Sequence, residues 1–195
     1  MLAIFAKEPV PGRVKTRLAA TIGADAAASV YAAFLADLVA VHAEAVLYVA
    51  EPGFPVELAG GLPVRVQHGP DLGARMARAF EDGVEVLIGS DLPTVSQEDI
   101  TAARTLLRDH DLVLGPAEDG GYWLIAMSRP LDVLSGIAWS TSDVLEQTLV
   151  RADQLGLRVA LLDTRFDVDT VDELRRLARL PDLPPHTATV VAAWG

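Results

Sequence analysis

Short apolar runs alternate with stretches of helical periodicity along this 195-residue chain. The run Leu2–Ala6 comes first. It is followed by a helical pattern in which Val30, Phe34, Leu38 and Val41 recur at spacings of four and three and so share one face. Repeated strand-then-helix units are typical of a mainly parallel sheet covered by helices. The sequence therefore predicts an α/β fold in which that helix face packs on the sheet.

Further strands and helices follow from the same patterns. The other predicted strands are Val46–Val49, Val64–Val66, 84–88, 112–114, Tyr122–Met127 and 159–162, and the direction of Tyr122–Met127 is left open. Helices are predicted over 72–80 and 142–155, and from two capping pairs, Ser96 with Asp99 and Thr170 with Glu173. Asp91 is thereby placed at the carboxyl end of a buried strand.

Length and composition fit one domain. The chain is 51% hydrophobic, enough to bury a full core. We expect residues 1–180 to form this domain and residues 181–195, with prolines at 181, 184 and 185, to form a loosely held tail.

The charge balance excludes several classes of partner. The chain carries 27 acidic and 16 basic residues, a net charge of −11. Nucleic acids and anionic membranes call for broad basic surfaces, so a small-molecule partner is expected. The absence of cysteine excludes thiolate metal sites and is consistent with the cytoplasm. No export or membrane signal is recognised.

One short loop runs against this acidic balance. Both lysines of the chain lie in the segment 7–17, together with two arginines and a single acid. A loop after a first strand is where open α/β sheets bind ligands, and Gly12 with its neighbouring prolines would open the backbone to phosphate. The loop lacks the GxxxxGK[ST] pattern of a P-loop, which disfavours a kinase or ATPase. The alternative is a composition effect, because 14 of the 16 cations are arginines. The expected nucleotide-binding residues are Lys7, Gly12, Arg13, Lys15, Thr16 and Arg17, joined by Gly73 and Arg75 at the start of a later helix.

Two acidic segments could hold a metal ion. Asp91, followed by Leu-Pro at the end of a buried strand, suits Mg²⁺, which takes one or two carboxylates plus phosphate oxygens. Asp167 and Asp169 would point to one side of an extended segment, and one of them could be a second ligand. Ordinary alternatives are a turn aspartate and acids favoured by a helix N-terminus. The D-x-D-x-T pattern also occurs in phosphatases, but there it follows the first strand.

Two segments could line the binding site of a second substrate that carries hydroxyl groups, such as a sugar or an alcohol. We call these two segments the acceptor wall. Glu118, Asp119, Gly120, Gly121 and Tyr122 place acids beside a glycine pair and an aromatic ring. Trp139, Ser140 and Thr141 add a stacking ring and two hydroxyls, although a helix cap explains the hydroxyls equally well.

Taken in order, these segments resemble a known superfamily. The pieces are 5–18, 71–73, 89–93, 115–122, 139–141 and 167–170. Their order is similar to that in small bacterial, MobA-like nucleotide-diphospho-sugar transferases, and the first piece also resembles phospholactate guanylyltransferases. The resemblance implies a single-domain, Rossmann-like glycosyltransferase-A fold, a nucleotide over the first loop, and Mg²⁺ or Mn²⁺ held by Asp91 and Asp169. Pro9 and Pro11 depart from the glycine-rich loop of many sugar nucleotidyltransferases, which leaves the base open.

The expected activity is a Mg²⁺-dependent transfer from a nucleotide-activated substrate to a small acceptor, with Asp91, Lys15 and Asp119 as the catalytic set and Asp119 as general base. Glycosyl transfer from a nucleotide-diphospho-sugar is slightly preferred. Nucleotidyl transfer with release of pyrophosphate, and a noncatalytic nucleotide-binding module, are the alternatives.

Overall fold

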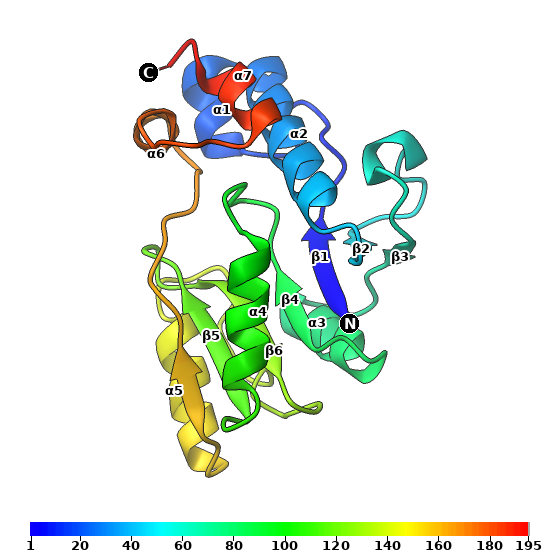
Figure 1. Cartoon of the computed structure of the whole chain (residues 1–195), viewed down its shortest axis with the longest axis vertical. Helices are drawn as coiled ribbons and strands as arrows, with labels where there is room; N and C mark the ends of the chain where they lie inside the picture. The colour runs from blue at the N-terminus through cyan, green and yellow to red at the C-terminus, as the bar shows by residue number, and fades with distance from the viewer. Residues whose placement is uncertain (195) are drawn as a thin grey trace.

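A seven-stranded mixed sheet forms the centre of the protein (Figure 1). The structure is a computed structural model that describes residues 1–194. The sheet order is β3-β2-β1-β4-β6-β5-β7. Its strands are β1 (Leu2–Ala6), β2 (Val46–Val49), β3 (Val64–Val66), β4 (Val86–Ile88), β5 (Leu112–Pro116), β6 (Tyr122–Met127) and β7 (Val159–Leu161). β6 runs antiparallel to β4 and β5, whereas the other neighbours pair in parallel. The mostly parallel sheet predicted from the sequence is confirmed, and β6 receives its direction.

Helices cover both faces of this sheet and its carboxyl-terminal edge. They are α1 (Thr16–Ile22), α2 (Ala24–Val41), α3 (Leu72–Glu81), α4 (Gln97–Leu106), α5 (Val144–Gln154), α6 (Val171–Ala178), α7 (Pro185–Val191) and the short 3-10 helix η1 (Val56–Ala59). α4 and α6 begin at the capping boxes of Ser96 with Asp99 and of Thr170 with Glu173, as the sequence predicted.

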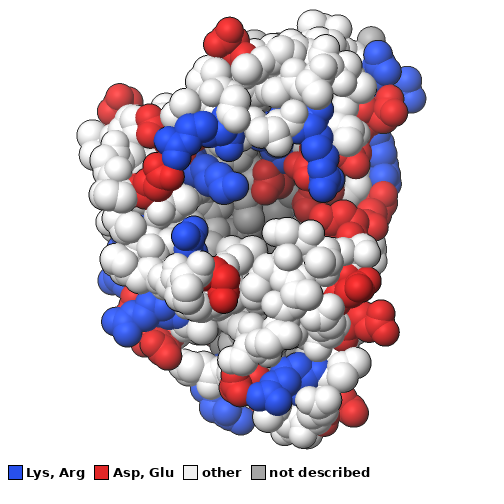
Figure 2. Space-filling view, turned by 180° about the vertical axis from the view of Figure 1, so that it is seen from behind, with Lys and Arg blue, Asp and Glu red and all other residues white. Residues whose placement is uncertain are grey.

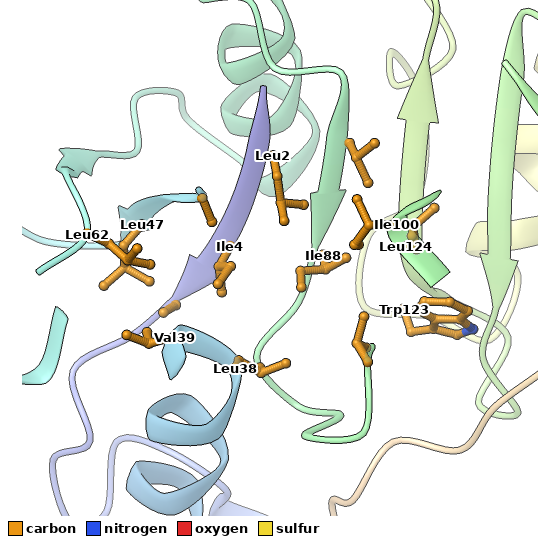
Figure 3. Close-up of a cluster of buried hydrophobic side chains, with 14 of the residues drawn as sticks. Leu2, Ile4, Leu38, Val39, Leu47, Leu62, Ile88, Ile100, Trp123 and Leu124 are labelled. Atoms are coloured by element: carbon orange, nitrogen blue, oxygen red, sulfur yellow. The ribbon is translucent and has the colours of Figure 1, made fainter. Parts of the chain in front are cut away.

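Alternate side chains of the strands point to opposite faces of the sheet and pack into two hydrophobic cores, one on each face. Leu2 and Ile4 of β1 lie in a cluster with Leu38 of α2 and Ile100 of α4 (Figure 3). Ala3 and Phe5, which alternate with them along β1, lie in the cluster on the opposite face of the sheet, together with Met76 and Phe80 of α3. Val41 is an exception to the predicted apolar face of α2: it is 39% exposed because it is the last residue of the helix.

The C-terminal segment differs from the predicted tail. Within the described part of 181–195, helix α7 packs on α2 and buries Thr187 and Val191. Asp37, buried within α2, accepts hydrogen bonds from the backbone amides of His186 (3.0 Å) and Thr187 (2.7 Å). These amides open α7 and have no partner within the helix, so a carboxylate from α2 supplies one. The expectation of a loosely held segment is therefore wrong; residue 195 lies outside the described residues.

Helix α2 is long and apolar enough, by length and composition alone, to cross a membrane. More than half of it is buried within the protein, where it packs against the sheet, η1, α1 and α7. Its apolar character is accounted for by its central place in the fold.

A buried histidine at the end of α2 makes stability depend on pH. The ring of His42 is wholly buried, and its Nε2 lies 3.1 Å from the carbonyl oxygen of Val95. Burial lowers its pKa, although the Val95 carbonyl and the carboxylates of Glu44 and Asp99 act in the opposite sense. The unfolded chain, with a histidine pKa of about 6.5, therefore takes up a proton at higher pH than the folded protein. We expect His42 to contribute stability above about pH 6.5 that is lost as the pH falls below it.

Replacing His42 by Gln, which does not titrate, tests this effect. Urea unfolding of both proteins near pH 7.5 and near pH 5.5 should show a smaller loss of unfolding free energy for the variant. Equal losses in the two proteins would contradict the assignment.

Candidate active site

The site lies where the order of the sheet reverses. From β1 the chain builds outward on one side through β2 and β3, whereas β4 pairs with the other edge of β1. In open α/β sheets the crevice beyond the carboxyl ends of such strands is the usual ligand site. The loop after β1 carries Lys15, and the loop after β4 carries Asp91. The topology thus brings together two residues that lie 76 positions apart in the sequence.

Lys15 is the centre of the charge cluster. Its side chain is only 2% exposed, and its Nζ forms ion pairs with Oδ1 of Asp91 and, at 3.1 Å, with Oδ1 of Asp169. Burial alone would lower the pKa of Lys15, but the two carboxylates outweigh it and the pKa is raised. The side chain is therefore an ammonium ion at neutral pH.

The backbone conformation of Lys15 is unusual. It has φ 46° and ψ 46°, a left-handed conformation rare outside glycine, and it stands at the N-cap of α1. This turn between loop and helix directs the side chain inward. The sequence predicted a loop through Arg17; the structure ends the loop at Lys15, and Thr16 and Arg17 open α1.

Asp167 and Asp169 reach the site through an irregular extension of the sheet. After β7 the backbone amide of Arg165 donates to the carbonyl of Pro116 at 3.0 Å, and the amide of Glu118 donates to the carbonyl of Arg165 at 2.8 Å. The amide of Val168 then lies 3.5 Å from the carbonyl oxygen of Asp91. These contacts bring the segment from the edge of the sheet to the loop after β4.

The side chain of Arg165 fixes this extension. Its guanidinium donates to both carboxylate oxygens of Asp99, at 2.9 Å and 2.6 Å, and lies 4.5 Å from the ring centroid of Trp123. Asp99 also belongs to the capping box of α4. Arg165 thereby ties the segment that carries the site aspartates to α4 and β6.

Four carboxylates converge on the cluster. The pKa of Asp167 is raised to about 7, first by burial and then by the negative charges of Asp91, Asp119 and Asp169, with Lys15 acting in the opposite sense. Among residues 1–194 no three acidic, histidine or cysteine side chains are arranged to hold a metal ion by themselves. Asp91 and Asp169, brought together on one ammonium, fit the Mg²⁺ site in which one or two protein carboxylates are completed by phosphate oxygens.

The other three cationic side chains of the loop, Arg17, Arg13 and Lys7, lie in different surroundings. Nη1 of Arg17 lies 3.8 Å from Oδ2 of Asp169, at the acidic cluster. Arg13 instead forms an exposed ion pair with Glu51 after β2. The side chain of Lys7 is exposed, and its backbone amide donates to the hydroxyl of Tyr31 at 2.9 Å.

Gly12 and Arg75 also have defined places. Gly12 has φ 78°, so the turn in the loop suits a glycine. Arg75, in the first turn of α3, donates from Nε to the carbonyl of Gly69 at 3.2 Å. Asp71 caps α3 by accepting from the amide of Ala74.

The expected acceptor wall is partly occupied by internal contacts. Glu118 forms a two-point ion pair with Arg176 of α6, at 2.6 Å and 2.8 Å, and this guanidinium lies 3.9 Å from the ring centroid of Phe166. Asp119 accepts from the amide of Gly121 at 2.9 Å. Gly120 has φ 90°, and a Cβ there would lie 1.9 Å from the carbonyl oxygen of Ser142, so the turn needs glycine.

Trp139 links this wall to α3. Its half-buried ring meets Tyr122 edge to face at 6.5 Å. A Cβ at Gly73 would lie 2.5 Å from the indole nitrogen, so Gly73 makes room for the ring. Thr141 donates to the carbonyl of Ala138, and Ser140 has φ 65° in a tight turn. The predicted nucleotide and acceptor segments are therefore in contact here.

Sequence reasoning missed Tyr31, Ser90, Arg165 and Arg176. The hydroxyls of Tyr31 and Ser90 lie 2.7 Å apart and tie α2 to the loop after β4. Tyr31, Arg165 and Arg176 stand in no motif, and each of the four contacts a partner at least 58 residues away in the sequence. Ser90 alone had a signal, since it immediately precedes Asp91.

A hollow lies near the middle of the face shown in Figure 2. Basic and acidic side chains gather around it, between the helical layer at the top of the view and the sheet below. This mixed pattern contrasts with the net charge of −11 and agrees with a cluster in which cations and carboxylates are paired.

Comparison with known proteins places the chain in a family. A curated relative, the phosphoenolpyruvate guanylyltransferase of Chloroflexus aggregans (strain MD-66 / DSM 9485), is 33% identical over 97 residues, 47% of this chain; the match spans about half of that relative, 46% of its length. A crystal structure from Desulfovibrio desulfuricans G20, described as a candidate nucleotide-diphospho-sugar transferase, is 32% identical. It superposes with a TM-score of 0.87 over 99% of this chain and 96% of that one.

A more distant structure shares the fold alone. A cytidylyltransferase from Leptospira borgpetersenii superposes with a TM-score of 0.56 and 12% identity, over 98% of this chain and 92% of that one. These three relatives are all named as transferases. The fold is that of the nucleotide-diphospho-sugar transferases, as the motif order implied. Residues 18–141 match the bacterial family described as "Uncharacterized protein conserved in bacteria (DUF2064)", and the chain belongs to that family.

Proposed function

We propose that this protein is a Mg²⁺-dependent transferase that acts on a nucleotide-activated substrate. The observation that carries the proposal is the ion-paired cluster of Lys15, Asp91 and Asp169 at the reversal point of the sheet. A cation-bearing loop on one side and paired carboxylates on the other suit a metal-bound diphosphate.

Asp91 and Asp169 would hold the Mg²⁺, or Mn²⁺ in its place. When bound, the ion would neutralise the charge that develops on the leaving phosphate. Arg17, which already lies beside Asp169, would bind the same phosphates from the opening of α1. The nucleotide would lie over the loop of residues 7–15.

Glycosyl transfer from a nucleotide-diphospho-sugar is the preferred reaction. Arg13, Lys15 and Arg17 each pair with a carboxylate, so the loop presents less net positive charge than its sequence indicates. A diphosphate therefore suits it better than a triphosphate. The similarity over nearly the whole chain to a candidate nucleotide-diphospho-sugar transferase supports the same preference.

Nucleotidyl transfer is the second candidate, and the guanylyltransferase relative favours it. In glycosyl transfer an acceptor oxygen attacks the anomeric carbon and a nucleoside diphosphate leaves; in nucleotidyl transfer it attacks the α-phosphorus and pyrophosphate leaves. For a hydroxyl acceptor Asp119 is the proposed general base in either reaction, because its Oδ1 is oriented by the Gly121 amide and its charge acts on the half-buried Asp167. The acceptor would lie against Tyr122 and Trp139.

A thermal-shift panel tests the proposal. Nucleoside diphosphates, triphosphates and nucleotide sugars are compared with and without Mg²⁺. A specific ligand at 100 times its Kd stabilises by about 2.7 kcal/mol, which is roughly 5–10 °C in Tm for a chain of this size. The bound ligand is then incubated with candidate acceptors, and release of nucleoside diphosphate or pyrophosphate separates the two reactions. A panel in which no nucleotide raises the Tm would contradict the proposal.

A further inference from the structure

The two oxygens that the proposed metal would need are already bridged by a cation. Nζ of Lys15 pairs with Oδ1 of Asp91 and Oδ1 of Asp169, and the Lys15 side chain is almost wholly buried. The carboxylates themselves are 49% and 37% exposed. The ammonium thus approaches them from the inside of the protein, while their outer sides remain open to solvent.

We propose that Lys15 is the resident counter-cation of this carboxylate pair, and that a divalent ion is held firmly only once a diphosphate is bound. This inference rests on the proposed function for the identity of the diphosphate. Without a bound diphosphate, an added divalent ion would lie a few ångströms from the fixed ammonium of Lys15 and would compete with it for the same carboxylate oxygens. A bound diphosphate adds negative charge for both cations and supplies the oxygen ligands that two aspartates lack.

The backbone conformation of Lys15 is relevant to a movement of its ammonium group from the carboxylates to a bound phosphate. Lys15 has a left-handed backbone conformation, which is unfavourable for a residue other than glycine. The residue also joins the turn at Gly12 to the first turn of α1. Transfer of the ammonium from the carboxylates to phosphate would release that conformation.

Replacement of Lys15 by Met tests the proposal without a nucleotide. Met keeps much of the apolar stem and removes the charge. Titration with Mn²⁺, followed by the electron paramagnetic resonance of the free ion, should show binding about tenfold or more tighter than in the wild-type protein. Adding Asp91→Asn to the Lys15→Met variant should abolish the gain.

Lys7→Met is the matched control, because it removes the other lysine of the same loop, whose side chain is exposed. It should leave the Mn²⁺ affinity measured without nucleotide unchanged. Equal affinities in the wild-type and Lys15→Met proteins, or an equal gain in Lys7→Met, would overturn the proposal.

A second measurement needs no variant. Because the chain has only two lysines, ¹⁵N-lysine labelling gives two side-chain amine signals, those of Lys7 and Lys15. Millimolar Mg²⁺ alone should leave the Lys15 signal in place, whereas Mg²⁺ with inorganic pyrophosphate should shift it. A shift of the Lys15 signal by Mg²⁺ alone, or none with both, would overturn the proposal even if Lys15→Met fails to fold.

The outcomes separate this inference from the proposed function. A gain of Mn²⁺ binding in Lys15→Met, with no nucleotide that stabilises the wild-type protein, would sustain the resident cation and reject the transferase. Mg²⁺-dependent nucleotide binding by the wild-type protein, with no gain of Mn²⁺ binding in Lys15→Met, would sustain the transferase and reject the resident cation.

Discussion

Replacing Asp91 by Asn is expected to lower the rate of transfer by roughly 100- to 1,000-fold, the usual cost of removing one group that stabilises developing charge. The carboxylate stands at the end of β4, pairs with Lys15 and is the first proposed metal ligand. Asn keeps the shape but provides a neutral oxygen. The variant is assayed for release of the nucleotide product at saturating Mg²⁺, alongside its circular dichroism and Tm.

Asp111→Asn is the control for this experiment. Asp111 also pairs with an arginine, Arg158, but it precedes β5 at the opposite end of that strand from the site. Its turnover should equal that of the wild-type protein. Full turnover in folded Asp91→Asn would show that the metal assignment is wrong. Nucleotide binding by a wild-type protein that turns nothing over would instead favour the noncatalytic module.

Replacing Arg165 by Met is expected to destabilise the fold by about 2–3 kcal/mol, or roughly 5–10 °C in Tm. Loss of one partner from a buried ion pair costs 3–5 kcal/mol, and the lower figure reflects side chains that are 28% and 16% exposed. The contact with Trp123 is lost as well. The variant should also bind Mg²⁺-nucleotide more weakly, because Arg165 anchors the segment of Asp167 and Asp169.

Arg158→Met provides the comparison. It removes an arginine from an exposed ion pair with Asp111, and such pairs contribute little to stability. Its Tm and nucleotide affinity should remain those of the wild-type protein. An Arg165→Met variant that melts and binds nucleotide like the wild type would contradict the anchoring role of the guanidinium.

Much of the sheet could be predicted from local sequence. β1, β2 and β3 occupy the predicted residues because short apolar runs bounded by turns leave few alternatives, and α4 and α6 start at their capping boxes. Helix α7 could not be predicted, since it is short and lies among prolines. Its amides are satisfied by Asp37, a residue about 150 positions earlier.

The sequence predicts several residues of the candidate site, but it does not predict which of them form ion pairs with one another. The position of Asp91 directly after β4 was confirmed, whereas the residue pattern named Asp167 and Asp169 together and only the resemblance chose Asp169. No local pattern indicates that Lys15 joins them, that Glu118 pairs with Arg176, or that Arg13 pairs with Glu51. Such contacts depend on how the chain returns from β7 to the centre of the sheet.

Isothermal titration calorimetry with the nucleotide that stabilises the protein best tests the central claim most directly. The wild-type protein should bind that nucleotide at least about tenfold more tightly with Mg²⁺ than without it, a coupling of about 1.4 kcal/mol. Asp91→Asn should lose the Mg²⁺-dependent part of the affinity and keep the rest. Binding that is unaffected by Mg²⁺, or equally dependent on Mg²⁺ in Asp91→Asn, would contradict a nucleotide–metal site at Lys15, Asp91 and Asp169.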